Sequence, residues 1–135
     1  MRTETSIIVI DDDAIQRFLI TTVLKEGGLC SSVEEFSDGK EFIGWMGEWD
    51  HSGSLLLFLD IMMPILNGWE VLDHLKQFFE GVEIYVVVVT SSNSPSDRDK
   101  AMSYSMVIEF SVKPFKLKDA IDIMAIPKVR KLLEK

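Results

Sequence analysis

Each of four apolar runs in this sequence leads to side chains that can do chemistry. These side chains are Asp11, Asp12 and Asp13 after the first run, Asp60 after the second, Thr90 at the end of the third and Lys113 after the fourth. Asp60 is the most conspicuous, because it interrupts the apolar segment "LLLFLDIMMP" at residues 55–64. A charged carboxylate in such a setting is costly unless it is paired, hydrogen-bonded or bound to a metal.

A divalent cation would remove the conflict among these acids. Carboxylates that lie together repel one another and raise each other's pKa. No His or Cys stands near them, and a ligand set made only of oxygen atoms selects a hard ion such as Mg²⁺. Mg²⁺ usually takes one or two protein carboxylates and keeps positions for phosphate oxygens. With the hydroxyl of Thr90 and the ammonium group of Lys113, such a site suits phosphoryl chemistry.

The elements that must position these residues alternate along the chain. Strands are expected at residues 6–10, 31–36, 54–60, 82–89 and 106–110. Helices are expected at residues 14–28, 38–49, 67–79, 94–104 and 116–126. Buried strands that alternate with helices favour an α/β fold with a parallel sheet covered on both faces.

Strand order decides whether the polar residues meet. Five strands joined by right-handed crossovers favour the flavodoxin-like, doubly wound order 2-1-3-4-5. Sites in such sheets lie at the carboxyl ends of the strands, near the switch point between strands 1 and 3. Strands 1, 3 and 4 are then neighbours, so we expect the acids, Thr90 and Lys113 to converge on one small area.

Three of the helices carry recognisable local signals. In the first, the residues near helical spacing are Ile15, Phe18, Leu19, Thr22 and Val23. In the third, the side chains expected to face inward are Val71, Leu72, Leu75 and Phe79. The fourth should start with Ser94 as its N-cap and Pro95 in its first position.

Composition limits the possible partners and compartments. The 135 residues are 47% hydrophobic, which suits one domain with a core. The net charge of −8 argues against non-specific binding to nucleic acid. No apolar stretch approaches the roughly 18 to 20 residues that span a bilayer, and the N-terminus lacks a secretory signal. The single cysteine, Cys30, excludes an internal disulfide and fits a reducing, cytoplasmic compartment.

Four segments together resemble a known family. "IIVIDDD", "FLDIMMPILNGWEVL", "VVVVTSS" and "VKPF" look like the receiver domain of two-component response regulators. The resemblance runs through about residue 125 and so covers nearly the whole chain. It implies that an aspartate is phosphorylated by a histidine kinase or phosphotransfer protein with Mg²⁺ bound. It also implies a signalling switch that catalyses only its own phosphorylation and dephosphorylation.

Carried over position by position, the resemblance assigns a role to each residue. It makes Asp60 the phosphoacceptor, and Thr90 and Lys113 the hydroxyl and the ammonium group that contact the phosphoryl group. The magnesium ligands that it implies are Asp11, Asp12, Asp60 and the backbone carbonyl of Met62. The peptide bond before Pro114 is commonly cis in the family. Asp13 stays outside the ligand set, because it can cap the helix that follows.

Three further positions bear on switching and on the lifetime of the phosphoryl group. In the family an aromatic residue of the fifth strand rotates inward when the threonine moves. Phe110 matches that position without the hydroxyl of the tyrosine common there, and a plain core residue is its other interpretation. Met62 and Ser92 match positions that tune the phosphoryl lifetime. Because the Met62 side chain is apolar and cannot orient water, we expect intermediate to slow autodephosphorylation.

Pro127 falls inside the last expected helix. An internal proline costs about 3 kcal/mol, because it removes one backbone hydrogen bond and clashes with the preceding turn. We therefore expect a break near Ile126 and then a short helix. This divides the chain into a receiver domain at residues 1–126 and a C-terminal helical extension at residues 127–135.

The expected partners follow from the resemblance. A sensor kinase or phosphotransfer protein would donate the phosphoryl group, and an unknown downstream protein would contact residues 94–126. Neither nucleic acid nor a membrane is expected as a partner. Since no output domain appears in the sequence, we expect a single-domain regulator, either natural or excised.

Other functions fit the residues less well. A haloacid-dehalogenase-type phosphatase also uses a strand-end aspartate, but it needs a second acid where Met62 stands. A flavodoxin-type FMN carrier needs a Ser/Thr-rich phosphate loop in place of the three aspartates. A receiver-like module that only binds partners is the remaining alternative. His51 and His74 have no partner pattern, so we expect both to face solvent.

Overall fold

A five-stranded parallel sheet forms the centre of the protein in a computed structural model that describes residues 5–28 and 33–134. Its strands are β1 (Thr5–Ile10), β2 (Glu34–Phe36), β3 (Ser54–Leu59), β4 (Ile84–Thr90) and β5 (Val107–Val112). Their order is β2-β1-β3-β4-β5. The predicted α/β class and flavodoxin-like strand order are thus confirmed. Cys30 lies outside the described residues.

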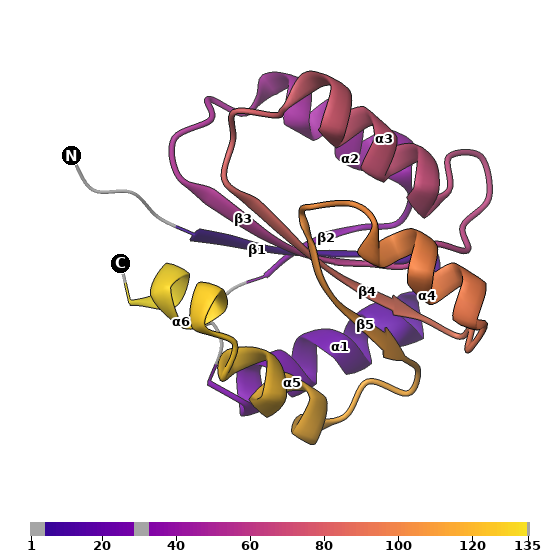
Figure 1. The fold of residues 1–135 in the computed structure, drawn as a ribbon, viewed down its shortest axis with the longest axis vertical. Coiled ribbons are helices and arrows are strands. Elements are labelled where there is room, and N and C mark those ends of the chain that lie inside the picture. The colour runs from indigo at the N-terminus through magenta and orange to yellow at the C-terminus, as the bar shows by residue number, and fades with distance from the viewer. Residues whose placement is uncertain (1–4, 29–32, 135) are drawn as a thin grey trace.

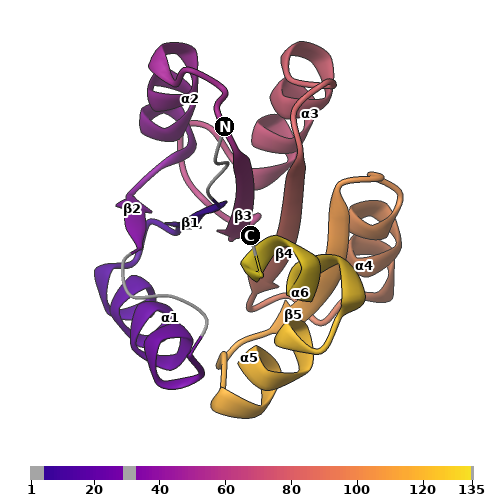
Figure 2. The same cartoon turned by 90° about the vertical axis from the view of Figure 1, so that its left-hand side faces the viewer.

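Helices cover both faces of this sheet. They are α1 (Ala14–Glu26), α2 (Gly39–Glu48), α3 (Gly68–Phe78), α4 (Pro95–Met102), α5 (Leu117–Met124) and α6 (Pro127–Leu133). Figure 1 shows α2 and α3 on one side of the strands and α1 and α5 on the other. Figure 2 shows α4 beside β5 at one edge of the sheet and β2 at the opposite edge. None of the helices in the described part of the chain combines the length and the apolar character needed to cross a membrane.

The sheet separates two hydrophobic cores. Alternate residues of β3 belong to different cores, because successive side chains of a strand point to opposite faces. Leu57 packs in the core with α2 and α3, and Phe58 packs in the core with α1 and α5. Every residue of β3 is buried. A central parallel strand is covered on both sides, which explains the unbroken apolar run at residues 55–59.

Side-chain caps fix where the helices begin next to the site. The Asp13 carboxylate accepts hydrogen bonds from the backbone N–H groups of Ile15 and Gln16, so Asp13 is the N-cap of α1. Ser94 caps α4, and Pro95 occupies the first helical position, as the sequence predicts. These starts lie directly after β1 and β4, at the end of the sheet that carries the acids.

The apolar stripe that indicated α1 is not the face that this helix buries. Ile15 and Phe18 are 69% and 67% exposed, whereas Ile20 and Leu24 are buried in the core. The residues at helical spacing therefore identify the helix, but they do not mark its buried face. The helix carries a second stripe, one or two residues out of phase with the first, and that stripe meets the sheet. His74 is expected to face solvent, but its ring is half-buried and packs on Phe78 and Phe79.

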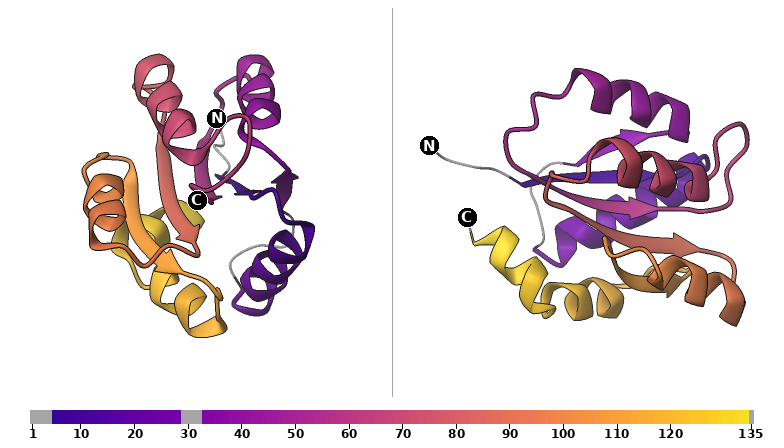
Figure 3. Two further views of the ribbon diagram at one scale, coloured as in Figure 1. Left: turned by 90° about the vertical axis from the view of Figure 1, so that its right-hand side faces the viewer. Right: turned by 45° about the horizontal axis from the view of Figure 1, so that its top comes forward.

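The chain breaks between α5 and α6 where proline predicts it. Ile126 is the N-cap of α6 and Pro127 is its first residue. Figure 3 shows the change of direction between the two yellow helices. Val129 is buried in the same core as α5, and the Thr5 hydroxyl donates to the Leu132 carbonyl over 3.2 Å. The extension thus packs on the body of the fold, while the domain boundary at residue 126 stays a prediction.

Candidate functional site

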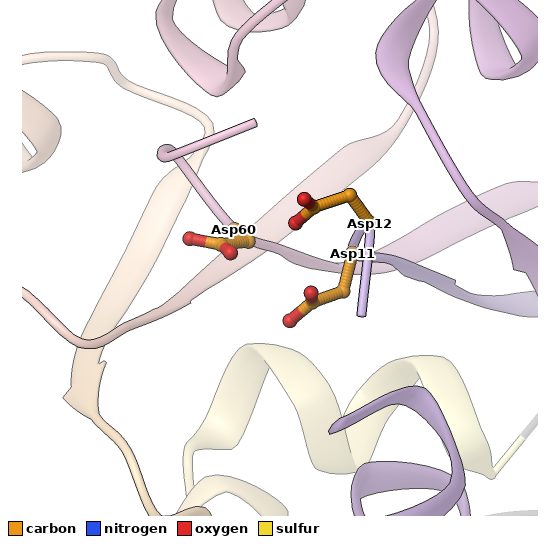
Figure 4. Close-up of side chains that lie close together, drawn as sticks. All are labelled: Asp11, Asp12 and Asp60. Atoms are coloured by element: carbon orange, nitrogen blue, oxygen red, sulfur yellow. The ribbon is translucent and has the colours of Figure 1, made fainter. Parts of the chain in front are cut away.

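Two strand ends bring the acidic residues together. Ile10 of β1 pairs with Leu59 of β3, and the Asp60 N–H donates to the Ile10 carbonyl over 3.0 Å. Asp11 and Asp60 therefore leave the sheet side by side (Figure 4). Asp11, Asp12 and Asp60 each offer an oxygen, and these three atoms lie within 4.8 Å of one another. The convergence expected from the strand order is present for all three acids.

Thr90 and Lys113 reach the site from the next two strands. Thr90 is the last residue of β4 and its side chain is fully buried. Lys113 directly follows β5, and its backbone N–H donates to the Thr90 carbonyl over 2.8 Å. The bond between Lys113 and Pro114 is cis, as the resemblance implies. The Thr90 hydroxyl and the Lys113 ammonium group therefore come from the hydrogen-bonded ends of two neighbouring strands.

Lys113 joins the two buried acids. Its Nζ lies 2.7 Å from Asp11 Oδ2 and 3.1 Å from Asp60 Oδ2. The contact with Asp60 has hydrogen-bond geometry. The contact with Asp11 is short but badly angled, so Asp11 Oδ2 is a buried oxygen with an ion-pair partner and no well-formed hydrogen bond. An atom of this kind is available to a further ligand.

Burial and pairing act in opposite directions on these charges. Burial raises the pKa of the Asp11 carboxyl, and the nearby Lys113 ammonium and Asp13 N–H oppose this rise only in part. For Lys113, burial lowers the pKa, but the carboxylates of Asp11 and Asp60 outweigh it and leave the pKa above its ordinary value. The lysine is therefore held firmly in its charged form, and its single positive charge can balance only one of the two acids that it contacts.

The arrangement fits a divalent metal. Asp11 contributes an incompletely bonded buried oxygen, and the Asp12 side chain is exposed beside it. All the candidate ligand atoms are oxygens, which is the donor set that Mg²⁺ prefers. A cation there would supply the charge that the acids leave unbalanced. Asp13, by contrast, is committed to capping α1, in agreement with its omission from the ligand set.

Met62 meets Asp60 through its backbone. Its N–H donates to Asp60 Oδ1 over 3.0 Å, which fixes one oxygen of the carboxylate while the other faces Lys113. The Met62 side chain is 60% exposed and stands at the rim of the site. The roles of its carbonyl as a metal ligand and of its side chain in the phosphoryl lifetime stay predictions.

Two residues of α4 make contacts near the site that the sequence did not predict. The Arg98 guanidinium lies 5.9 Å from the ring of Phe110 and donates to the Phe110 carbonyl over 3.3 Å. Phe110 itself is buried in the core, so its rotation stays a prediction. Ser92 donates its hydroxyl to Asp97 over 2.6 Å. Asp97 is half-buried and stands three residues after the N-cap Ser94, a spacing that marks a helix start but not a bond to Ser92. Arg98 is exposed and resembles any solvated charge in the sequence, so no local signal would have found its contact.

Comparison with known proteins places the chain in a family. The model of the response regulator receiver domain matches residues 7–125. The two-component response regulator ARR17 of Arabidopsis thaliana is 28% identical over 127 residues, which cover 88% of this chain and 82% of that protein. ORR1 of Oryza sativa subsp. japonica is 26% identical over 120 residues, covering 85% of this chain and 52% of the relative. This chain therefore spans about half of that second relative.

A solved structure agrees with these matches. The crystal structure of a two-component response regulator from Cytophaga hutchinsonii superposes with a TM-score of 0.79 and 27% sequence identity, and the match covers 99% of this chain and 100% of that one. The fold, the order of the elements and the acidic site at the strand ends all agree with the family match. The chain belongs to the response regulator receiver domain family.

Proposed function

We propose that this protein is a phosphoacceptor switch of two-component signalling, with Asp60 as the residue that takes the phosphoryl group. The observation that carries the proposal is the placement of Lys113 between Asp60 and Asp11, beside an incompletely bonded carboxylate oxygen. One oxygen of Asp60 is fixed by a backbone N–H and the other lies against an ammonium group. This combination orients a nucleophile and also prepares a partner for the incoming negative charge.

In the proposed reaction an Asp60 oxygen attacks the phosphorus of a phosphohistidine. An O–P bond forms, the P–N bond breaks and its electron pair returns to the imidazole nitrogen. Asp11, Asp12 and Asp60 would hold Mg²⁺, whose charge offsets the acids and the phosphoryl oxygens. Lys113 stays charged and pairs with the new phosphoryl oxygens, and the Thr90 hydroxyl donates to another of them. Both contacts require small movements of side chains that now have other partners.

The donor in this proposal is a sensor kinase or a phosphotransfer protein in the cytoplasm. Ile15 and Phe18 support a protein donor, because they expose apolar surface within two turns of Asp12 on the helix that starts at the site. The output would pass to a downstream protein on the face of α4, β5 and α5. No nucleic acid or membrane takes part in this proposal.

The direct test is covalent labelling with a small phosphodonor. We expect acetyl phosphate and Mg²⁺ to add one phosphoryl group, detected by intact mass, and we expect the chelator EDTA to prevent it. Asp60→Asn should abolish the adduct, whereas Asp122→Asn, an exposed position on α5, should leave it unchanged. Absence of the adduct from the unmodified protein would contradict the proposal, and steady turnover of phosphate esters would favour a phosphatase.

Met62 gives the proposal a kinetic test. Its exposed, apolar side chain cannot position an attacking water, so we expect the adduct to persist well beyond seconds in Mg²⁺ after removal of the donor. Met62→Gln adds an amide at the rim and should shorten this lifetime. Met62→Leu is the matched control and should preserve it. A half-life of seconds or less for the unmodified protein would refute this part of the proposal.

A further inference from the structure

A chain of hydrogen bonds leads from Thr90 to the first turn of α4. The Ser92 N–H donates to Thr90 Oγ1 over 3.3 Å, and the Ser92 hydroxyl donates to Asp97 Oδ2 over 2.6 Å. The same hydroxyl oxygen accepts the N–H of Ser94, which caps the helix and accepts the N–H of Asp97. Ser92 is thus the common partner of the buried Thr90 hydroxyl and of the start of α4.

Helix α4 is attached to the rest of the fold mainly through polar groups. Ala101 is its only buried residue. Arg98 reaches the Phe110 carbonyl, and Lys100 Nζ lies 4.2 Å from the centre of the Trp69 ring on α3. Partly exposed contacts of this kind contribute little free energy each, so an element that depends on them is displaced at low cost.

We infer that Ser92 and Asp97 are positioning residues that transmit the position of the Thr90 hydroxyl to α4. This inference rests on the proposed function, because the Thr90 oxygen leaves Ser92 only if it turns toward a phosphoryl group. The Ser92 N–H then loses its acceptor, and the loop after β4 is free to follow. The Ser92 hydroxyl holds Asp97, so the first turn of α4 moves with the loop.

Trp69 is a built-in reporter of that movement. It lies on α3, which buries three apolar side chains and stays in place, while its ring contacts Lys100 and stacks on Tyr104 at 6.5 Å and 21°. A shift of α4 changes both neighbours of the indole. The other tryptophans are Trp45 on α2 and Trp49 at its C-cap; they stack on each other and have no ring contact with α4 in the part of the chain that the structure describes.

The test measures phosphorylation and Trp69 emission in the same sample. A Trp45→Phe, Trp49→Phe parent protein is treated with acetyl phosphate and Mg²⁺, and its adduct and its fluorescence are followed together. We expect the parent to gain the adduct and change its emission. Ser92→Ala and Asp97→Ala should gain the adduct but lose most of the emission change, because the link to α4 is cut.

Two controls separate this link from general effects on the helix. Asp97→Asn removes the charge near the helix start but keeps an acceptor oxygen for the Ser92 hydroxyl, so it should retain the emission change. Ser96→Ala removes an exposed hydroxyl that lies 2.8 Å from the Ser94 hydroxyl and takes no part in the link from Thr90, so it should behave as the parent does. Circular dichroism of every variant before labelling establishes that the overall fold is retained.

The outcomes separate a failure of this inference from a failure of the proposed function. An adduct without any emission change in the parent overturns the inference and leaves the proposed function standing. A full emission change in folded Ser92→Ala that carries the adduct overturns it as well. Failure of the parent to form the adduct overturns the proposed function, and the inference falls with it. Equal losses in Asp97→Asn and Asp97→Ala would assign the effect to charge at the helix start and refute the hydrogen-bond link.

Discussion

Two neighbouring helices on the same face of the sheet are held in opposite ways. Helix α3 buries Val71, Leu72 and Leu75, and a reciprocal pair of hydrogen bonds between Asn67 and Glu70 closes its start. Helix α4 buries one alanine and depends on hydrogen bonds, an ion pair and ring contacts. The contrast indicates that α3 is fixed on this face of the sheet, whereas α4 is held weakly enough to move. The site lies at the strand ends that both helices follow.

The attachment of α3 to the site goes through backbone. A Cβ added at Gly68 would lie 2.5 Å from Ile61 Cα and 2.6 Å from the Asp60 carbonyl oxygen. The Gly68 N–H also donates to the Ile61 carbonyl over 3.1 Å. Only glycine lets α3 start this close to the proposed phosphoacceptor. By comparison, the start of α4 touches the site through one serine side chain.

The largest expected effect comes from the buried side of α3. Leu72→Ala should lower the free energy of unfolding by about 2–5 kcal/mol, because it removes buried methyl groups and leaves a cavity. Met102→Ala on α4 should change it by less, about 1 kcal/mol or below, since 41% of that residue is already exposed. Urea unfolding of both variants measures the two values. Equal losses of stability in the two variants would contradict the view that α3 is held by its buried side chains and α4 is not.

The next effect tests the close approach of α3 to Asp60. Gly68→Ala should cost about 1–3 kcal/mol of stability, because the new methyl group meets backbone that cannot move aside. It should also slow formation of the acetyl phosphate adduct, since the strain falls on the Asp60 carbonyl. Gly47→Ala in α2 is the matched control, because its Cβ meets nothing within 4 Å. That variant should gain about 0.5–1 kcal/mol from its better helix former.

A smaller effect is expected in the loop that leads into α3. Ile65 has φ of 69° and closes a tight turn in which the Leu66 N–H donates to the Pro64 carbonyl over 2.9 Å. A β-branched residue in the left-handed region is strained by about 1–3 kcal/mol. Ile65→Gly should therefore raise the thermal midpoint despite the greater freedom of glycine in the unfolded chain. Ile65→Val keeps the branching and should not; a lower midpoint for Ile65→Gly would show that the turn is unstrained.

The smallest effect concerns the hydrogen bond from Tyr104, which follows the C-cap of α4, to Asp73 on α3. Burial, and then the hydrogen bond to Asp73, raise the pKa of Tyr104 to about 12. Since this folded-state pKa lies above the ordinary value of 10.0, the contribution of Tyr104 is complete below pH 10 and is lost as pH rises through 12. Phenolate absorbance in a Tyr85→Phe background should follow Tyr104 alone. Asp73→Asn should move the transition to lower pH. An unchanged transition would show that Asp73 does not hydrogen-bond Tyr104.

Sequence patterns predicted the features that depend on backbone order. The strand sequence fixes the positions of Asp11, Asp60, Thr90 and Lys113, because parallel strands must deliver their carboxyl ends to one edge. Pro127 likewise interrupts the last helix, because proline is accommodated in the first turn of a helix but not in its interior. Such features depend on the residues at the ends of the strands and on the order of the strands in the sheet. Both can be derived from the order of apolar runs along the chain.

Features that depend on rotation or on distant pairs escaped prediction. Helix α1 carries two apolar stripes, and only contact with the sheet decides that Ile20 and Leu24 turn inward and Phe18 outward. The Ser92–Asp97 bond needs the exact turn of the loop after β4, which no periodicity encodes. The ring contact of Lys100 with Trp69 joins residues of two helices whose relative placement is a property of the fold alone.

The short strand β2 has a consequence for solubility. It lies at an open edge of the sheet and has three residues, of which Glu34 and Glu35 are exposed. An open strand edge can form hydrogen bonds with a strand of another chain, and short edge strands with charged side chains make this pairing less favourable. Two adjacent carboxylates would meet the same pair on a second copy and repel it. This edge lies next to β1, the strand that leads to the proposed metal ligands, and it is thereby protected against strand addition and the aggregation that follows from it.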